Sequence, residues 1–235
     1  MSKTIVVVGF GPGISTAVAE KFGAEGYSVA LVARSKARLA EGVQALKAKG
    51  VTAAAFPADA GDPAAIAAAI ARARAELGPI NVLQWNAYSG SDVGDLLAAD
   101  PAAVRGVFDV GVVGLLAAVQ AARADLKSQA GAVLVTNGAF GENSPVMDAL
   151  AKNLKAMGVA LANAAKCKLV GLLSQALSDD GIYVGEVTVA GVVKGTAWDS
   201  GGADGQAIPG IEGARIANTF WDLFQARGEV RARIS

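Results

Sequence analysis

The chain alternates short apolar runs with longer segments whose apolar residues recur every three or four positions. The short runs are typical of strands that are buried on both faces, and the longer segments are typical of amphipathic helices. The predicted strands are 4–9, 28–33, 52–57, 81–86, 132–137, 182–188 and 230–234. The predicted helices are 14–25, 36–49, 63–77, 101–127, 144–177 and 211–225.

Strict alternation of strands and helices determines the predicted architecture. Each strand–helix–strand connection is expected to be a right-handed crossover, which places the strands in one parallel sheet. We therefore predict a single α/β domain over 1–235, a Rossmann fold with a doubly wound seven-stranded parallel sheet and helices on both faces. Asp62 before Pro63 and Asp100 before Pro101 predict two helix starts. The glycine-rich segment 200–205 is predicted to be a mobile loop.

The first strand leads directly into a glycine-rich turn. Four apolar β-branched residues, 5–8, are followed by Gly9, Gly11 and Gly13, and an amphipathic helix follows. Glycines allow a tight turn and leave room for a ligand close to the backbone. The first N–H groups of the helix and the positive end of its dipole then point over the turn, an arrangement that favours pyrophosphate. The residues expected to bind a dinucleotide here are Gly9, Phe10, Gly11, Pro12, Gly13 and Ile14.

Composition narrows the chemistry that the chain can perform. With 235 residues, 53% of them hydrophobic and 18% charged, the chain can form one large core and is too apolar to be disordered. It has no histidine and one cysteine, Cys167. This excludes an internal disulfide, the usual zinc sites, and Ser-His-Asp or Cys-His catalysis. Acid–base chemistry is left to lysine, tyrosine, serine, carboxylates, water or the substrate.

Charge and hydropathy predict a cytoplasmic protein. The 21 Lys and Arg residues balance the 21 Asp and Glu residues and are scattered along the chain. No basic stripe favours nucleic acid, and no polybasic cluster favours a membrane surface. The longest uninterrupted apolar runs, such as 111–118, are too short to cross a bilayer. We therefore expect no nucleic acid, no membrane and no metal site.

Several short motifs occur in the order known from one protein family. They are Val8-Gly9-Phe10-Gly11-Pro12-Gly13-Ile14, Asp59-Ala60, Asn86-Ala87-Tyr88, Lys166 with Gly171 and Gly181, and Ala190-Gly191-Val192-Val193 with Thr196. Through these motifs the chain resembles the short-chain dehydrogenase/reductase (SDR) family over essentially its whole length. The resemblance implies a nicotinamide cofactor, with Asp59 and Ala60 at the adenine, Asn86 and Ala87 on the ribose side, and Val193 at the nicotinamide.

The chain departs from the catalytic pattern of the family it resembles. The family's Tyr-x-x-x-Lys falls on Ala162 and Lys166, so the lysine is kept and the tyrosine is replaced. The family's serine falls on or near Gly138, and its asparagine falls on Gly111. In this chemistry the tyrosine gives a proton to the substrate oxygen, the serine holds that oxygen, and the lysine assists the tyrosine and binds the nicotinamide ribose. Lys166 is therefore the expected catalytic residue and also a cofactor-binding residue.

The end of the second predicted strand bears on the choice of cofactor. It reads Leu31-Val-Ala-Arg34-Ser35 and lacks the acidic residue that binds the adenosine ribose of NAD. A guanidinium here suits a 2′-phosphate, so we expect NADP(H) to be preferred over NAD(H), with Arg34 and Ser35 at the phosphate and Arg38 as a candidate helper. The alternative is that Arg34 is a solvated arginine that caps the helix.

Two classes of function remain open from the sequence. One is an atypical NADP(H)-dependent oxidoreductase that delivers hydride to a small molecule needing no tyrosine, such as an activated C=C bond or an iminium. The other is a catalytically inactive cofactor-binding sensor or scaffold subunit. Asn137, Asn143 and Asn163 are candidates to orient a substrate, although each also suits a turn or a cap. Tyr88 is expected to pack with its hydroxyl satisfied.

The helices at 101–127 and 144–177 also predict self-association. Both carry more small and apolar residues than one face of a sheet requires. Small residues let helices of two subunits approach closely, and the family resemblance implies contacts through these two helices. We therefore expect a homodimer or a homotetramer.

Overall fold

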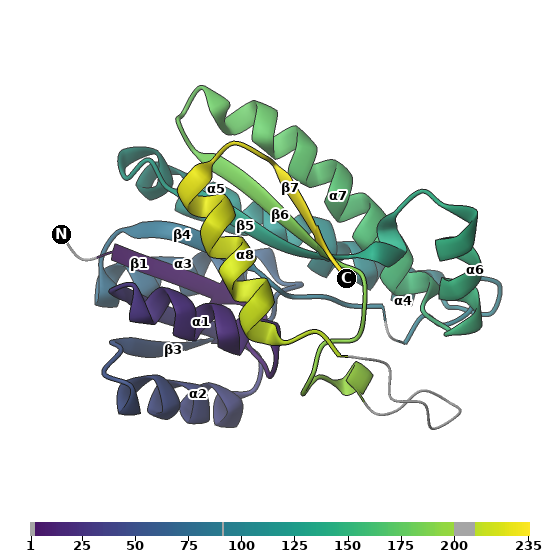
Figure 1. The fold of residues 1–235 in the computed structure, drawn as a ribbon, viewed down its shortest axis with the longest axis horizontal. Coiled ribbons are helices and arrows are strands. Elements are labelled where there is room, and N and C mark those ends of the chain that lie inside the picture. Colours follow the sequence, from purple (N-terminus) through teal and green to yellow (C-terminus); the bar gives the residue numbers. More distant parts are fainter. Residues whose placement is uncertain (1–2, 91, 200–209) are drawn as a thin grey trace.

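The structure of the protein is a computed structural model, which describes residues 3–90, 92–199 and 210–235 (Figure 1). Within these residues, seven strands form one sheet in the order β3-β2-β1-β4-β5-β6-β7, and every neighbouring pair is parallel. The strands are β1 (Lys3–Val8), β2 (Tyr27–Ala33), β3 (Ala53–Pro57), β4 (Ile80–Trp85), β5 (Ala132–Gly138), β6 (Tyr183–Val189) and β7 (Arg231–Ile234). The predicted fold class is confirmed, because the strand order reverses beside β1 as in a Rossmann fold. The predicted loop at 200–205 lies outside the described residues.

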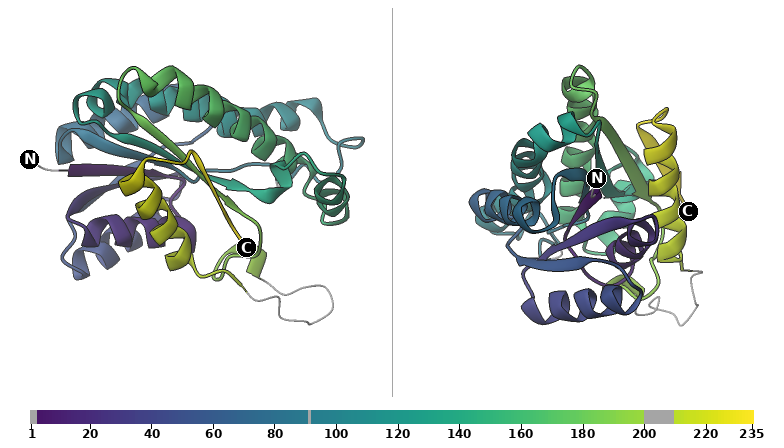
Figure 2. Two further views of the ribbon diagram at one scale, coloured as in Figure 1. Left: turned by 45° about the horizontal axis from the view of Figure 1, so that its top comes forward. Right: turned by 90° about the vertical axis from the view of Figure 1, so that its left-hand side faces the viewer.

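Helices cover both faces of the sheet (Figure 2). One face carries α1 (Ile14–Ala24), α2 (Lys36–Ala48) and α8 (Gly213–Ala226), and the other carries α3 (Pro63–Leu77), α5 (Gly114–Ser128) and α7 (Met157–Ser178). Successive residues of a strand point to opposite faces. Ile5 and Val7 of β1 accordingly pack with the first group of helices, whereas Val6 and Val8 pack with the second.

Two predicted helix starts are confirmed. Asp62 and Asp100 cap α3 and α4 (Pro101–Phe108), where their Oδ1 atoms accept backbone N–H bonds at 2.8 to 3.0 Å. Pro63 and Pro101 occupy the first turns of these helices. The caps and the fixed φ of proline thus define both starts locally, without tertiary contacts.

The predicted helix 101–127 is continuous but contains a wider turn. A π-helical segment, η1 (Asp109–Val113), separates α4 from α5. A Cβ on Gly114, immediately after it, would lie only 1.9 Å from the carbonyl oxygen of Ala60. The glycine therefore lets the start of α5 touch the loop after β3, and π turns of this kind often occur near functional sites.

The prediction of one helix at 144–177 is wrong. The structure divides this segment into α6 (Pro145–Asn153) and α7. Lys155 between them has a φ of 51°, and the N–H groups of Lys155 and Ala156 donate back to carbonyls of α6. This pairing is a Schellman motif, which ends a helix. Glycine is the usual residue at its left-handed position, so a lysine gave no signal for the break.

Within the residues that the structure describes, two helical segments are long and apolar enough to span a membrane by length and composition alone. An 18-residue window within Pro101–Ser128 reaches a mean hydropathy of 1.9, and one within Met157–Ser178 reaches 1.2. Counting uninterrupted apolar runs missed both. Residues of α5 and α7 belong to the core on one face of the sheet, as in the core helices of globular proteins, so their hydropathy is weak evidence for a membrane.

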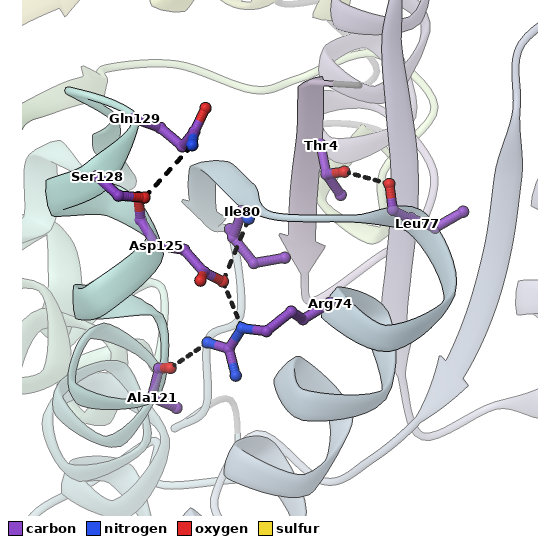
Figure 3. Close-up of polar contacts among 8 residues, drawn as sticks. All are labelled: Thr4, Arg74, Leu77, Ile80, Ala121, Asp125, Ser128 and Gln129. Carbon is purple, nitrogen blue, oxygen red and sulfur yellow. Dashed lines mark hydrogen bonds and ion pairs between the residues drawn. The ribbon is translucent and has the colours of Figure 1, made fainter. Parts of the chain in front are cut away.

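A polar network braces the sheet at the amino ends of β1 and β4 (Figure 3). Arg74 in α3 donates through Nε to Asp125 in α5 at 2.5 Å, and Asp125 also accepts the N–H of Ile80 at 3.3 Å. Thr4 Oγ1 donates to the carbonyl of Leu77 at 2.9 Å. These bonds tie α3 and α5 to the starts of two central strands. This end of the sheet is therefore structural, and ligand binding is expected at the carboxyl ends of the strands.

Candidate functional site

The glycine turn lies at the carboxyl end of β1, where the strand order reverses. Gly9 and Gly13 both have a φ of 83°, which residues with side chains rarely adopt. A Cβ on Gly9 would lie 2.4 Å from the backbone nitrogen of Ala87, and a Cβ on Gly13 would lie 2.7 Å from Cγ2 of Thr196. The turn thus requires glycine at both positions, for its conformation and for its close contacts.

Helix α1 leaves its first N–H groups available above this turn. Its N-cap residue is Gly13, which has no side chain that could accept these N–H groups. In α2, α3 and α4, by contrast, the N-cap side chain accepts a backbone N–H of the first turn. Ser15 Oγ instead turns back to Gly11, accepting its N–H at 2.8 Å and donating to its carbonyl at 2.9 Å. The turn is therefore fastened to the helix, and the positive helix end stays open to an anion.

Phe10 and Pro12, the other predicted residues of the turn, offer a ligand little beyond their backbone. The ring of Phe10 is buried against α2, where a Cβ on Gly42 would lie 2.3 Å from it. The N–H of Phe10 donates to the carbonyl of Val32 at 3.0 Å. Pro12 is exposed. The Phe10 side chain accordingly anchors the turn in the core.

Two exposed arginines stand beside the turn. Arg34 follows β2, and Arg38 lies in the first turn of α2 with Nη1 3.8 Å from the position of a Cβ on Gly11. Within the described part of the chain, neither guanidinium makes a hydrogen bond or an ion pair. The cap of α2 is Ser35, whose Oγ accepts the N–H of Arg38 at 3.3 Å. Arg34 is therefore not the capping residue, and both guanidinium groups are available to a phosphate.

The segments after β3 and β4 approach the same end of the sheet. Asn86 Nδ2 donates to the carbonyl of Gly9 at 3.3 Å, and buried Ala87 packs directly on Gly9. Asp59 is exposed, and its Oδ1 accepts a backbone N–H of its own loop at 2.9 Å. The carbonyl of Ala60 contacts the start of α5. Asn86 and Ala87 thus lie at the turn itself, whereas Asp59 and Ala60 belong to the neighbouring loop.

The loop after β6 covers another side of the turn. Buried Val193 places Cγ1 3.4 Å from the position of a Cβ on Gly13. Thr196 Oγ1 donates to the carbonyl of Val193 at 2.7 Å, and a β-bridge pairs Val193 with Ile211. The structure therefore brings Val193 and Thr196, almost two hundred residues along the chain, against the first glycine turn.

Lys166 lies on α7 with only 3% of its surface exposed. Burial lowers the pKa of Lys166 to about 8, and the nearby Glu186 carboxylate opposes this by raising it. Glu186 in β6 is fully buried and accepts hydrogen bonds from Asn137 Nδ2 and, at 2.8 Å, from Arg231 Nε. Sequence reasoning missed Glu186 and Arg231, although a glutamate inside an apolar strand was a signal for a buried pair.

Three residues without functional groups, Gly111 in η1, Gly138 in β5 and Ala162 in α7, lie close to the part of α7 that leads to Lys166. The Cβ of Ala162, one helical turn before Lys166, lies 3.5 Å from the position of a Cβ on Gly111. A Cβ on Gly138 would lie 2.6 Å from Nδ2 of Asn163. The backbone therefore brings Gly111 close to Ala162, and Gly138 close to Asn163, on the stretch of α7 that precedes Lys166.

The structure also places Tyr88 and the three asparagines that were candidates to orient a substrate. Tyr88 is 51% exposed, so the prediction that it packs is wrong: its loop turns the ring outward. Asn143 is exposed and lines a hollow of about 360 Å³ with Phe140 and Leu161. Asn137 is bonded to Glu186, whereas the side chains of Asn143 and Asn163 make no hydrogen bond within the described residues; of these two, only Asn163 is buried.

The sheet order and the glycine turn define a Rossmann-fold protein. The sequence pattern described as short chain dehydrogenase matches residues 3–197. The chain therefore belongs to the short chain dehydrogenase family. Among curated relatives, 2,3-dihydro-2,3-dihydroxybenzoate dehydrogenase of Bacillus subtilis is 41% identical over 81 residues, which cover 34% of this chain and 31% of that protein. The chain spans 26% to 37% of the lengths of the curated relatives it matches.

Solved structures match over nearly the whole chain. A metagenomic short-chain oxidoreductase in complex with NADP is 22% identical, with a TM-score of 0.80, and the match covers 100% of this chain and 97% of that one. A blue fluorescent protein from a metagenomic library, in complex with NADPH, is 26% identical, with a TM-score of 0.82, covering 99% and 96%. These similarities agree with the fold derived from the strand order.

Proposed function

We propose that the protein is an atypical, cytoplasmic NADP(H)-dependent oxidoreductase that transfers hydride to a small organic substrate. The observation that carries the proposal is that a glycine turn with two free arginines and the buried lysine of α7 occur on one Rossmann scaffold. Similar solved structures contain NADP or NADPH, and the Bacillus subtilis relative is named a dehydrogenase. These names support the proposed cofactor and reaction class.

The residues around the glycine turn fit a nicotinamide adenine dinucleotide phosphate, NADP(H). The uncapped start of α1 and the required glycines at 9 and 13 suit a pyrophosphate, and the unpaired guanidinium groups suit a 2′-phosphate. When bound, this cofactor supplies the hydride. The proposed contacts are Gly9, Phe10, Gly11, Pro12, Gly13 and Ile14 at the pyrophosphate, Arg34 and Ser35 with Arg38 at the 2′-phosphate, Asp59 and Ala60 at the adenine, Asn86 and Ala87 on the ribose side, and Lys166 and Val193 at the nicotinamide end.

The catalytic tetrad of the proposed enzyme is degenerate. Ala162, Gly138 and Gly111 carry no group that donates a proton or holds an oxygen. Lys166, with a pKa of about 8, is mostly protonated at neutral pH and is the proposed proton donor together with water. Loss of a positioned general acid costs on the order of 10²–10⁴-fold in rate. Simple ketones are therefore expected to react slowly, and an activated C=C bond or an iminium is the better substrate.

The same three substitutions favour a second candidate function, a cofactor-binding sensor or scaffold subunit without turnover. A screen of NADPH oxidation across simple ketones, enones and imines separates the two, with Lys166→Ala as the control. Oxidation with enones or imines that Lys166→Ala abolishes supports the oxidoreductase. If no substrate of the three classes is reduced although NADPH binds tightly, the non-enzymatic function is favoured. If simple ketones react at ordinary rates, the interpretation that Ala162 has replaced a needed proton donor is refuted.

Replacing Arg34 with aspartate is expected to change the choice of cofactor. The substitution removes a cation from the end of β2 and adds a carboxylate that repels a 2′-phosphate. NADPH affinity should fall about 10- to 100-fold, the value of one or two charge-assisted hydrogen bonds, whereas NADH affinity should stay the same or rise. Calorimetric titration measures both, and Arg105→Asp, at an exposed position of α4, is the matched control. Equal losses for both cofactors would place Arg34 outside the phosphate site.

We also propose a homodimer or homotetramer formed through α5 and α7. Val113, Leu116 and Leu172 are 41%, 37% and 57% exposed on this side of the sheet, although they are large and apolar. Light scattering of the wild type at micromolar concentration should give the mass of two or four chains, and Leu172→Glu should shift it toward one. A wild-type monomer under these conditions would refute the assembly.

A further inference from the structure

The side chain of Asn163 fills the space that a side chain on residue 138 would occupy. From the position of a Cβ on Gly138, Nδ2 of Asn163 is 2.6 Å away, whereas its Oδ1 is 4.0 Å away. A residue with a Cβ at 138 would therefore collide with the amide nitrogen. By the family resemblance, the substrate-binding serine falls on or near Gly138, so the substitution of that serine and the placement of this amide are structurally linked.

The Asn163 amide is buried but has no partner. Asn163 is 4% exposed, and within the described residues its side chain makes no hydrogen bond. In that part of the chain the fully enclosed unpaired side-chain atoms are Gln84 Oε1 and Trp85 Nε1, so the amide of Asn163 still opens to solvent. A buried polar group without a partner costs free energy that a ligand can recover. The amide is thus a buried donor without a protein partner among the described residues, and it is not completely enclosed.

The surrounding backbone holds this amide in place. Asn137 Nδ2 donates to the carbonyl of Asn163 at 3.0 Å, and Asn137 Oδ1 accepts the N–H of Gly138 at 3.1 Å. The 3-10 turn η2 (Ala139–Gly141) packs so closely that a Cβ on Gly141 would lie 2.8 Å from Cβ of Asn163. Asn163 precedes Lys166 by three residues, so both side chains lie on neighbouring positions of one helical face.

We propose that Nδ2 of Asn163 donates a hydrogen bond to a carbonyl oxygen of the substrate, in the role that a hydroxyl at residue 138 would otherwise have. This inference rests on the proposed function and narrows its substrate to a conjugated carbonyl compound. An iminium nitrogen has no lone pair to accept the bond, so it gains nothing from this donor. An amide stabilises negative charge on oxygen but does not give up its proton.

A conjugated carbonyl suits this donor set. Its reduction by NADPH adds a hydride to the carbon distal from the carbonyl and a proton to the carbon beside it, leaving NADP⁺ and the saturated carbonyl compound. The oxygen carries negative charge only between these two additions, so it needs hydrogen-bond donors and no acid of its own. Asn163 supplies the donor, and Lys166 or water supplies the proton to carbon.

The test compares Asn163→Ala, Asn163→Asp, Gly138→Ser and the double variant Gly138→Ser/Asn163→Ala. Cyclohex-2-enone is titrated by calorimetry into protein loaded with NADP⁺, where no turnover occurs, and NADPH oxidation is measured separately. We expect both Asn163 variants to bind the enone about 3- to 10-fold more weakly and to lose about 10²-fold in kcat/KM. Their NADP⁺ affinity should stay within about twofold of the wild type, because the amide serves the substrate.

The double variant provides the sharpest outcome. Gly138→Ser alone should lower enone binding, because its Cβ displaces the amide, whereas removing Asn163 as well makes room for the new hydroxyl and should restore at least about tenfold in kcat/KM. Unchanged enone binding and turnover in both Asn163 variants, or a wild type that binds no enone, would overturn the proposal. If thermal melts show that the Gly138 variants do not fold, the two Asn163 variants still decide whether Asn163 binds the carbonyl oxygen.

The results that would refute the proposed oxidoreductase function differ from those that would refute the role of Asn163. A wild type that fails to bind NADP⁺, or that binds it and oxidises no NADPH with any substrate, refutes the oxidoreductase. The enone titration, made into NADP⁺-loaded protein where NADP⁺ binds and into cofactor-free protein where it does not, still shows whether Asn163 binds a carbonyl oxygen, because its readout is heat of binding and not turnover.

Discussion

Replacing Gly9 with alanine is expected to destabilise the fold by at least about 3 kcal/mol and to abolish NADPH binding. The new Cβ would lie 2.4 and 2.5 Å from the backbone nitrogen and Cα of Ala87, and backbone atoms cannot move aside as a flexible side chain can. The φ of 83° adds about 1 kcal/mol of strain. Relief requires β1 and β4 to separate at the glycine turn, which would also break the bond from Asn86 Nδ2 to the Gly9 carbonyl.

Gly50→Ala is the matched control for this substitution. Gly50 has a similar φ of 77°, but a Cβ there would meet nothing within 4 Å. It therefore carries the backbone strain without the collision, and we expect a loss of about 1 kcal/mol and unchanged NADPH affinity. Urea unfolding and calorimetric titration measure the two effects. Equal destabilisation by Gly9→Ala and Gly50→Ala would contradict the close contact between the turn and Ala87.

Replacing Lys166 with methionine is expected to stabilise the protein while removing its activity. Burial lowers the pKa of Lys166 from 10.5 to about 8, against a smaller opposing effect of Glu186. This difference corresponds to about 3 kcal/mol of lost stability when the lysine is protonated. Methionine of similar length avoids that cost, because Glu186 keeps its bonds to Asn137 and Arg231. Turnover should fall about 10²–10⁴-fold with the loss of the proton donor.

The effect of Lys166→Met on stability is expected to depend on pH. Between pH 8 and 10.5 the unfolded chain holds the Lys166 proton and the folded chain has released it, so wild-type stability rises with pH across this window. The advantage of Lys166→Met should therefore be largest below pH 8 and vanish near pH 10.5. Urea unfolding at several pH values measures it, with Lys168→Met, exposed on the same helix, as the control. An advantage that does not change with pH would show that Lys166 is not buried as a cation.

The strands and most helices were predictable because local signals and tertiary packing agree. The apolar run of β1, the alternation of elements and the caps at Asp62 and Asp100 all indicate the observed fold. The break before α7 was not predictable, because it depends on a lysine, Lys155, in a left-handed conformation that usually requires glycine. The π turn between α4 and α5 was also missed, and the close approach of Gly114, the residue after it, to Ala60 is a long-range contact that the local sequence does not show.

The glycine turn of the candidate site was more predictable from the sequence than the surroundings of Lys166. The glycine turn is local in sequence, so its residues, 9–14, could be predicted from the strand before them and the helix after them, whereas its contacts with Ala87 and Thr196 could not. The surroundings of Lys166 depend on long-range pairing: Glu186 and Arg231 meet across β6 and β7, and Asn163 meets Gly138 across α7 and β5. No pattern of spacing in one chain shows which asparagine will lie opposite a glycine 25 residues earlier.

Calorimetric titration of the wild-type protein with NADPH and NADH decides whether the glycine turn, the start of α1 and the arginines after β2 together hold a nicotinamide adenine dinucleotide phosphate. We expect NADPH to bind one site per chain, at least about tenfold more tightly than NADH. Absence of binding by both cofactors, or equal affinity for the two, would contradict it.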